Sequence, residues 1–298
     1  MVQIYTDTSA NLMASMYHEY DIHVISLYYY IDGEEHTCLD VENFDTEGYY
    51  KAIGGGKKVT TSQITPGQYL QAFRPHLEAG EDIVYISMAK NISGTWNSAE
   101  TASQQLREEF PERRITVINT KGAGLGEGIV ALVAAQCRAN GGDYDAICEA
   151  AVRATRYIMQ IFTVDDLNYL GRTGRVSNFT AFIGTALNIK PLLKGTDDGV
   201  IATFEKARGR KKALKSLLKY YEEDVVNASE RTVFITHTNA KEDAEQFAQQ
   251  IRESSQPPKE VIVLPHEPIT GSHLGPGALA LFFISKHNRD TGKDDGLY

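Results

Sequence analysis

The first half of the chain repeats one local pattern: a short apolar run, a polar turn and an amphipathic stretch. Strands that alternate with helices in this way are typical of a parallel α/β sheet. The pattern therefore predicts an N-terminal parallel-sheet α/β domain over residues 1–157. It predicts strands at 2–5, 23–30, 82–87 and 115–118, and helices at 66–77, 93–109, 126–139 and 144–157.

After residue 157 the apolar runs and helical stretches are arranged differently, and two of the runs face each other across a glycine-containing turn. We predict a second, C-terminal α/β domain over residues 158–298. Its expected strands are 159–163, 190–194, 200–206, 232–236 and 260–264, and its expected helical segments are 165–170, 178–187, 211–223 and 241–254.

The composition limits the classes of partner and compartment. Hydrophobic residues make up 42% and charged residues 23%, which is the balance of a soluble globular protein. The formal net charge of -9 makes nucleic acid a poor partner. No apolar run approaches the roughly 20 residues of a membrane span, and we see no signal peptide. We therefore expect a cytoplasmic protein whose three cysteines stay reduced.

Two hydroxyl-rich turns are candidates for binding an anion. Ser93-Gly94-Thr95 follows an expected strand and opens a helix, and Thr61-Ser62 precedes another helix. Small residues at a helix start let backbone N–H groups and hydroxyls point at an anion. Ordinary helix capping explains both turns equally simply. Ligands bind at the carboxyl ends of parallel strands, so we expect the polar turns to gather at one edge: 6–9, 60–63 and 90–95.

The glycine-rich segment 271–277 contains His273, which we interpret as a side chain in a rigid loop. It is a candidate donor to a carboxylate, and a structural histidine is the alternative. Ser93 and His273 also suggest a nucleophile and a base. No orienting carboxylate is apparent for them, so we predict no catalytic residue. The wide spacing of the three cysteines matches no zinc site, and we predict no metal site.

Several basic residues suggest a second anion contact or a docking face. Arg172 and Arg175 flank a glycine turn, where an arginine can reach a phosphate or carboxylate bidentately. Lys206 and Arg208 lie in the locally basic stretch 190–219. On an acidic protein such a stretch favours a specific docking face, and a solvated surface is the alternative.

Six segments, in order and over nearly the whole chain, resemble the DegV family. They are Thr61-Ser-Gln63-x-x-Pro66, Ile92-Ser-Gly-Thr95 with Ser98-Ala99, Phe162-Thr-Val-Asp-Asp-Leu-x-Tyr-Leu170, Gly174-Arg-Val-Ser177, Ile189-Lys-Pro191 and His273-x-Gly-Pro-Gly277. The chain departs from the family at Thr8, which follows Asp7 in the first turn, at Asn119-Thr120 and at Ile64.

The resemblance implies a long-chain fatty acid, such as palmitate, stearate or oleate, in a buried tunnel between the two domains. It implies that Thr61, Ser93 and His273 hold the carboxylate, with Ser62, Gly94 and Thr95 in the same turns. Some family members are the acyl-binding subunit of bacterial fatty acid kinase, so the expected partner is an ATP-binding kinase subunit. Arg172, Arg175, Lys206 and Arg208 are the expected contacts to that partner or its phosphates.

The resemblance implies no cofactor beyond the fatty acid, and transient contact with a membrane is compatible with it. Two alternatives stay open: a regulatory lipid-binding module without a kinase partner, and a Ser/His hydrolase or acyltransferase. The candidate tunnel-lining side chains, taken from apolar stretches beside the motifs, are Phe162, Phe182, Ile183, Leu187 and Leu281.

Overall fold

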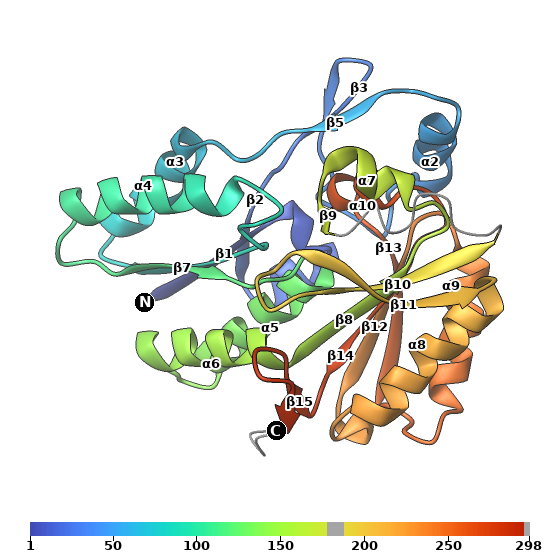
Figure 1. The fold of residues 1–298 in the computed structure, drawn as a ribbon. Helices are drawn as coiled ribbons and strands as arrows, with labels where there is room; N and C mark the ends of the chain where they lie inside the picture. Colours follow the sequence, from blue (N-terminus) through green and yellow to red (C-terminus); the bar gives the residue numbers. More distant parts are fainter. Residues whose placement is uncertain (178–187, 295–298) are drawn as a thin grey trace. The chain divides into compact units, whose positions relative to one another are not determined.

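The computed structural model describes residues 1–177 and 188–294, and it shows the expected α/β class (Figure 1). The chain forms two compact units. Unit 1 comprises Met1–Val41 and Thr60–Thr155, and unit 2 comprises Glu42–Val59 and Arg156–Tyr298. Residues 42–59 therefore belong to unit 2, although the predicted division at residue 157 places them in the N-terminal domain. The predicted helix 178–187, with Phe182, Ile183 and Leu187, lies outside the described residues.

Unit 1 is built on a four-stranded parallel sheet with the order β2-β1-β6-β7. Helices α3 and α4 cover one face of this sheet and α5 covers the other (Figure 1). The elements are β1 (Val2–Asp7), α1 (Ala14–Glu19), β2 (Ile22–Ile25), α3 (Pro66–Glu78), β6 (Asp82–Ser87), α4 (Thr95–Glu109), β7 (Ile115–Asn119), α5 (Leu125–Ala139) and α6 (Tyr144–Tyr157), which runs on into unit 2. A small three-stranded sheet has the order β4-β3-β5, from β3 (Tyr29–Ile31), β4 (Glu34–His36) and β5 (Val59–Thr61).

Local signals placed α3 correctly. Thr65 caps the helix, and its hydroxyl accepts a hydrogen bond from the Gln68 amide. The Gln68 side chain accepts one from the Thr65 amide at 2.9 Å, which completes a capping box. Pro66 occupies the first helical position, where its missing N–H costs nothing.

The single strand predicted over residues 23–30 is wrong, because the chain forms β2 and β3 with a break between them. Side chains satisfy the backbone of Leu27 at this break. The Leu27 amide donates to Thr8 Oγ1, and the Leu27 carbonyl accepts from Thr37 Oγ1, both at 2.9 Å. A strand ladder cannot use groups that are already bonded in this way.

Unit 2 contains a seven-stranded mixed sheet with the order β13-β12-β14-β8-β10-β11-β9. Helices α8 and α9 pack on one face over an apolar core that includes Ile161, Leu217, Phe247 and Leu281. The elements are α2 (Thr46–Gly54), β8 (Ile158–Thr163), α7 (Asn168–Thr173), β9 (Val176–Ser177), β10 (Ile189–Gly195), β11 (Ile201–Arg208), α8 (Arg210–Asp224), β12 (Thr232–His237), α9 (Lys241–Arg252), β13 (Glu260–Pro265), α10 (Pro268–Leu274), β14 (Leu279–Ile284), β15 (His287–Asn288) and β16 (Lys293–Asp294).

The register of β8 and β14 separates two of the candidate tunnel residues. Leu281 pairs with Ile161 and lies with it in the core beneath α8 and α9. Phe162 pairs with Ala280. Successive side chains of a strand point to opposite faces, so Phe162 faces away from that core. Phe162 and Leu281 therefore do not line one cavity together.

The loop predicted around His273 is also wrong, because His273 lies in the last turn of helix α10. The side chain of Glu267 caps this helix by accepting from the amides of Ile269 at 2.5 Å and Thr270 at 2.8 Å. Pro268 opens the helix, and Gly275, with φ 73°, ends it. The sequence Glu-Pro before the glycines carries this cap signal.

A pair of carboxyl groups is buried in unit 1, one at the end of β1 and the other in the first turn of α5. Asp7 and Glu127 are both fully buried, and the Ser9 hydroxyl lies between them. Ser9 Oγ is 2.5 Å from Asp7 Oδ1 and 2.9 Å from Glu127 Oε2. One hydroxyl has only one proton to donate, so a carboxyl group must supply the proton of the other contact. The pair therefore holds one more proton than two separate ionised carboxylates.

This shared proton predicts a pH dependence of stability. Burial raises the pKa of Asp7 above its unfolded value of about 3.9, against its hydrogen bonds from Ser9 and Tyr85. The folded state therefore binds this proton more tightly than the unfolded state does. The resulting stabilisation of the fold is lost as the pH rises from the Asp7 pKa of the unfolded state towards that of the folded state. We expect the free energy of unfolding by urea to fall over that window, and Asp7→Asn to flatten the fall.

The matched control is Glu108→Gln, an exposed carboxyl group on α4. It makes the same carboxyl-to-amide change without touching the pair, so its pH profile should parallel that of the unaltered protein. Parallel profiles for Asp7→Asn as well would show that the buried pair holds no extra proton.

Candidate functional site

The Ser93-Gly94-Thr95 turn connects β6 to α4 in unit 1. The Ser93 hydroxyl donates to Thr95 Oγ1 at 2.9 Å and accepts from the Thr95 amide at 3.2 Å. Gly94 is the N-cap of α4, and Ser93, one residue before it, accepts from the first amide of the helix, which begins two residues later than predicted. Thr95 is fully buried, whereas Ser93 and Gly94 are half-buried. The capping role that the sequence left open is thus present, and it fixes the position of the Ser93 hydroxyl.

The Thr61-Ser62-Gln63 turn lies against the start of α4. The side-chain amide Nε2 of Gln63 donates to Ser98 Oγ at 3.1 Å. A Cβ added at Gly94 would lie only 1.8 Å from Gln63 Oε1. The glycine therefore lets the two hydroxyl-rich turns approach, and unit 1 brings Thr61, Ser62 and Ser93 into one region.

The turns at 60–63 and 90–95 come together as expected, but the turn at 60–63 does not extend from a strand of the four-stranded sheet. Residues 6–9 span the end of β1, and residues 90–95 come after the adjacent parallel strand β6. Residues 60–63 instead span the end of β5 in the small three-stranded sheet, and the Ser62 amide donates to the Tyr28 carbonyl at 3.0 Å. Only the tertiary fold carries this turn to α4.

A directed chain of hydrogen bonds holds α10, the helix of His273, in unit 2. Thr270 has one hydroxyl proton and donates it to the Glu267 carboxylate. His266 Nε2, 2.7 Å from Thr270 Oγ1, must then be the donor of that contact. His266 Nδ1 in turn accepts from the Thr236 hydroxyl at 2.7 Å. Burial lowers the pKa of His266 to about 3, so the ring is neutral and a single tautomer fits.

Helix α2 braces α10 from another side. The Tyr49 hydroxyl donates to the Pro268 carbonyl at 2.9 Å. Tyr50 is buried against Gly271, where an added Cβ would lie 2.0 Å from the tyrosine hydroxyl. The sequence alone did not reveal this contact, although Asp45 is a normal N-cap for α2.

Two glycines that follow His273, Gly275 and Gly277, pack closely against the segment that follows β8. Gly275 (φ 73°) and Gly277 (φ 85°) have positive φ angles that favour glycine. A Cβ at Gly275 would meet the Tyr169 ring at 2.3 Å, and one at Gly277 would meet the Asp165 carboxylate at 2.3 Å. Two segments far apart in the sequence are therefore fitted to each other.

The environment of His273 suits a neutral hydrogen-bond donor. Burial, and then the positive charge of Arg175, lower the pKa of His273 to about 4. The imidazole is therefore neutral at pH 7 and keeps one N–H. Because Arg175 acts on His273 electrostatically, unit 2 brings these two predicted site residues near each other.

The other predicted basic residues occupy different positions in unit 2. Arg172 lies on α7 with its guanidinium over the Tyr169 ring at 5.7 Å. Lys206 and Arg208 are exposed near the end of β11. Arg208 pairs with Ile189 at the start of β10.

Two further findings concern the described residues only. Among them, no group of three or more His, Cys, Asp or Glu side chains is arranged to hold a metal ion. None of the helices in residues 1–177 and 188–294 has the length and apolar character needed to cross a membrane.

Comparison with known proteins assigns the chain to a family. The DegV model, described as "Uncharacterised protein, DegV family COG1307", matches residues 1–286. The chain belongs to the DegV family. A DegV domain-containing protein of Clostridium perfringens (strain 13 / Type A) is 36% identical over 285 residues, which cover 94% of this chain and 96% of the relative.

Solved DegV structures share the fold. A DegV family protein from Thermus thermophilus, described by its fatty acid binding, has a TM-score of 0.86 and 27% identity, covering 95% of this chain and 99% of the other. A DegV family protein from Ruminococcus gnavus, solved with vaccenic acid, has a TM-score of 0.82 and 25% identity, covering 94% and 99%. Members of the family thus take fatty acids as ligands.

The DegV motifs of this chain combine candidate ligand contacts with residues that only support them. Sequence reasoning selected Thr61, Ser93 and His273 but missed Gln63, His266 and Glu267. Gln63 stands inside a quoted motif, and Glu267 precedes a proline, so both had a signal. His266 had none, because its partner Thr236 is distant in sequence.

Breaking the hydrogen-bond chain at Thr270 should destabilise the protein. Thr270→Val keeps the side-chain shape but leaves the buried Nε2–H of His266 without its acceptor. We expect the free energy of unfolding to fall by about 1–3 kcal/mol, measured by urea denaturation. Ser272→Ala is the control on the same helix, because the Ser272 hydroxyl donates only to the Ile269 carbonyl of its own turn. Equal effects of the two variants would contradict the proposed chain.

Proposed function

We propose that this DegV chain binds a long-chain fatty acid in a buried tunnel, holds the carboxylate with Thr61, Ser93 and His273, and presents it to a separate ATP-binding kinase subunit. The observation that carries the proposal is the neutral, half-buried His273 beside the charge of Arg175. The fatty acids of related DegV proteins supply the class of ligand.

The chemistry of a carboxylate fits these groups. A carboxylate that leaves water needs hydrogen-bond donors, and each charged hydrogen bond contributes about 1.5–3 kcal/mol. A neutral imidazole donates one such bond without its own desolvated charge. Arg175 adds positive potential nearby. The acyl tail contributes about 0.8 kcal/mol per buried methylene, so the tail dominates affinity while the polar groups orient the carboxylate.

The kinase role rests on the resemblance and on charge. The sequence contains no G-x-x-x-x-G-K-[ST] loop, so the proposal assigns ATP to the partner subunit. Arg172 and Arg175 flank Gly174, near the helix that carries His273. Together with Lys206 and Arg208, they are the proposed contacts to the partner or its phosphates. A regulatory lipid-binding role without this partner is the second candidate for the same site.

A hydrolase role has weaker support. Within unit 1, the Ser93 hydroxyl donates to Thr95 and accepts from the Thr95 amide. A serine nucleophile needs a base that accepts its proton. The Ser93 proton instead points to another hydroxyl, which favours carriage of the ligand over acyl transfer.

Loading with fatty acid should raise the pKa of His273. An adjacent carboxylate favours the imidazolium, so we expect a rise of about 1–3 units from the value near 4 in delipidated protein. Imidazole NMR titration with and without oleate measures it, and His273→Gln assigns the signal. An unchanged His273 pKa would place the carboxylate elsewhere.

Ser93→Ala and His273→Ala should impair the presentation of the carboxylate to the kinase subunit more than the binding of the fatty acid. Each variant loses one head-group hydrogen bond, so oleate affinity should fall by about tenfold, whereas acyl phosphate formation with a cognate kinase subunit should fall further. Ser272→Ala is the control for both measurements. Normal acyl phosphate rates in both site variants would refute the residue roles.

The broader claim is tested by mass spectrometry of denatured purified protein. Absence of a co-purifying fatty acid, together with no binding of added oleate or palmitate, would contradict fatty-acid binding. Binding without acyl phosphate formation would instead favour the regulatory role.

A further inference from the structure

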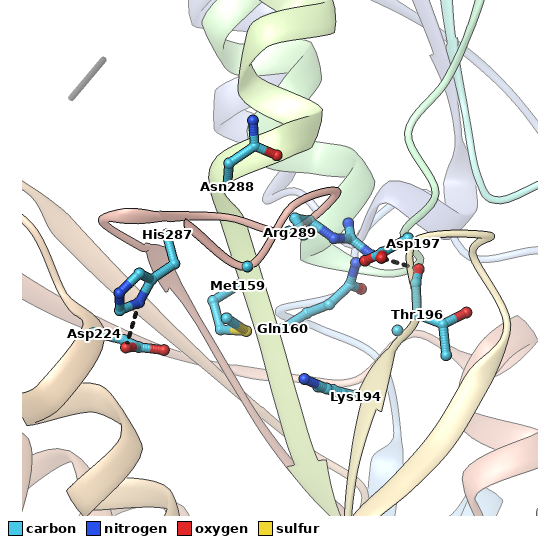
Figure 2. A pocket seen from close by; sticks show the side chains of 11 residues that line it. Met159, Gln160, Lys194, Thr196, Asp197, Asp224, His287, Asn288 and Arg289 are labelled. Atoms are coloured by element: carbon cyan, nitrogen blue, oxygen red, sulfur yellow. Dashed lines mark hydrogen bonds and ion pairs between the residues drawn. The ribbon is translucent and has the colours of Figure 1, made fainter. Parts of the chain in front are cut away.

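A cavity of about 380 Å³ lies within unit 2, where β8 begins and β10 ends (Figure 2). Met159 and Gln160 of β8 form its floor, and the loop around Arg289 borders it. Pockets that bind small molecules are commonly of this size or larger. The cavity is therefore large enough for a small organic molecule.

The cavity is separate from the residues assigned to the carboxylate. It lies at the start of β8, whereas the opposite end of that strand, Thr163, pairs with Leu279 just after the glycines that follow His273. Met159 and Thr163 are four steps apart along the strand, which is roughly 13 Å. A ligand in this cavity would thus not compete with a head group at His273.

Two cations face the cavity from different elements. Lys194 lies one residue before the end of β10, with its ammonium over the Phe204 ring at 5.6 Å. Arg289 reaches across to the turn after β10, where its guanidinium donates to the Thr196 carbonyl at 3.2 Å. These two side chains bring positive charge to one region of the lining.

The lining also holds two acidic side chains, Asp197 and Asp224, which equal the two cations in number. Asp224 is paired with His287 at 2.8 Å on the other side of the cavity. Asp197 is exposed and acts favourably on the Arg289 charge, as does Asp290. Arg289 is half-buried, and an anion in contact with its guanidinium offsets the cost of removing that charge from water.

The arginine is held in place before any ligand arrives. Its amide donates to the Arg156 carbonyl at 2.7 Å. The adjacent Asn288 is buried, and its side chain accepts from the Asp290 amide at 2.9 Å, which closes a tight turn. A donor fixed in this way loses little freedom on binding.

We propose that this cavity binds a small organic oxyanion, a carboxylate or phosphate compound of low molecular mass, with the anionic group between Lys194 and Arg289. The oxyanion accepts hydrogen bonds from the ammonium and the guanidinium. Asp197 opposes it electrostatically and limits its affinity.

The test uses the full chain and two probes, inorganic phosphate and succinate, titrated calorimetrically at constant ionic strength. At least one probe should bind saturably, and the stronger one distinguishes phosphate from carboxylate chemistry. Lys194→Met should weaken that probe about tenfold, the loss of one charged hydrogen bond. Asp197→Asn should tighten it, because the repelling carboxylate is gone.

Lys212→Met is the matched control, since Lys212 is an exposed lysine of α8 outside the cavity lining. It should leave both affinities unchanged, and all three variants should keep oleate binding. The proposal is overturned if neither probe binds saturably, or if Lys212→Met weakens binding as much as Lys194→Met. Should Lys194→Met fail to fold, Asp197→Asn decides alone: unchanged or weaker binding refutes the site.

Discussion

A carboxylate withdrawn from water is tolerated only where hydrogen-bond donors stand ready for it, and in unit 2 one buried carboxylate already meets this condition. Glu267 accepts the first amides of α10 and the hydroxyl of Thr270. This cap starts the helix, and the chain of bonds through His266 orients it. The position of His273 follows from these contacts. A donor placed by a rigid helix loses less freedom on binding than one on a loose loop.

The glycines of the DegV motifs act mainly as points of close approach. Gly94 admits the Gln63 side chain, and Gly275 and Gly277 admit Tyr169 and Asp165. Each contact joins two motifs that are distant in sequence. A motif of this kind therefore records packing as much as ligand contact, and the hydroxyl or imidazole beside the glycine is positioned by that packing.

Some elements were predictable because their signals are local. The start of α3 follows from Thr65, Pro66 and Gln68 alone. The interruption between β2 and β3 was not predictable, because it depends on a hydrogen bond between Leu27 and the Thr8 hydroxyl, which comes from another part of the chain. The shared proton of Asp7 and Glu127 was hidden for the same reason. Helix α10 was not predicted, because the glycines around His273 indicated a loop, whereas the capping residue Glu267 indicates the start of a helix.

The sequence by itself determined the α/β class, the DegV membership and the candidate residues Thr61, Ser93 and His273, because these depend on periodicity and on motifs read in order. The tertiary structure decided which side chains support them. It assigned residues 42–59 to unit 2, where Tyr49 braces α10, and it placed Arg175 near enough to influence His273. The physical reason is that burial and hydrogen bonding depend on distances in space, which a linear pattern does not contain.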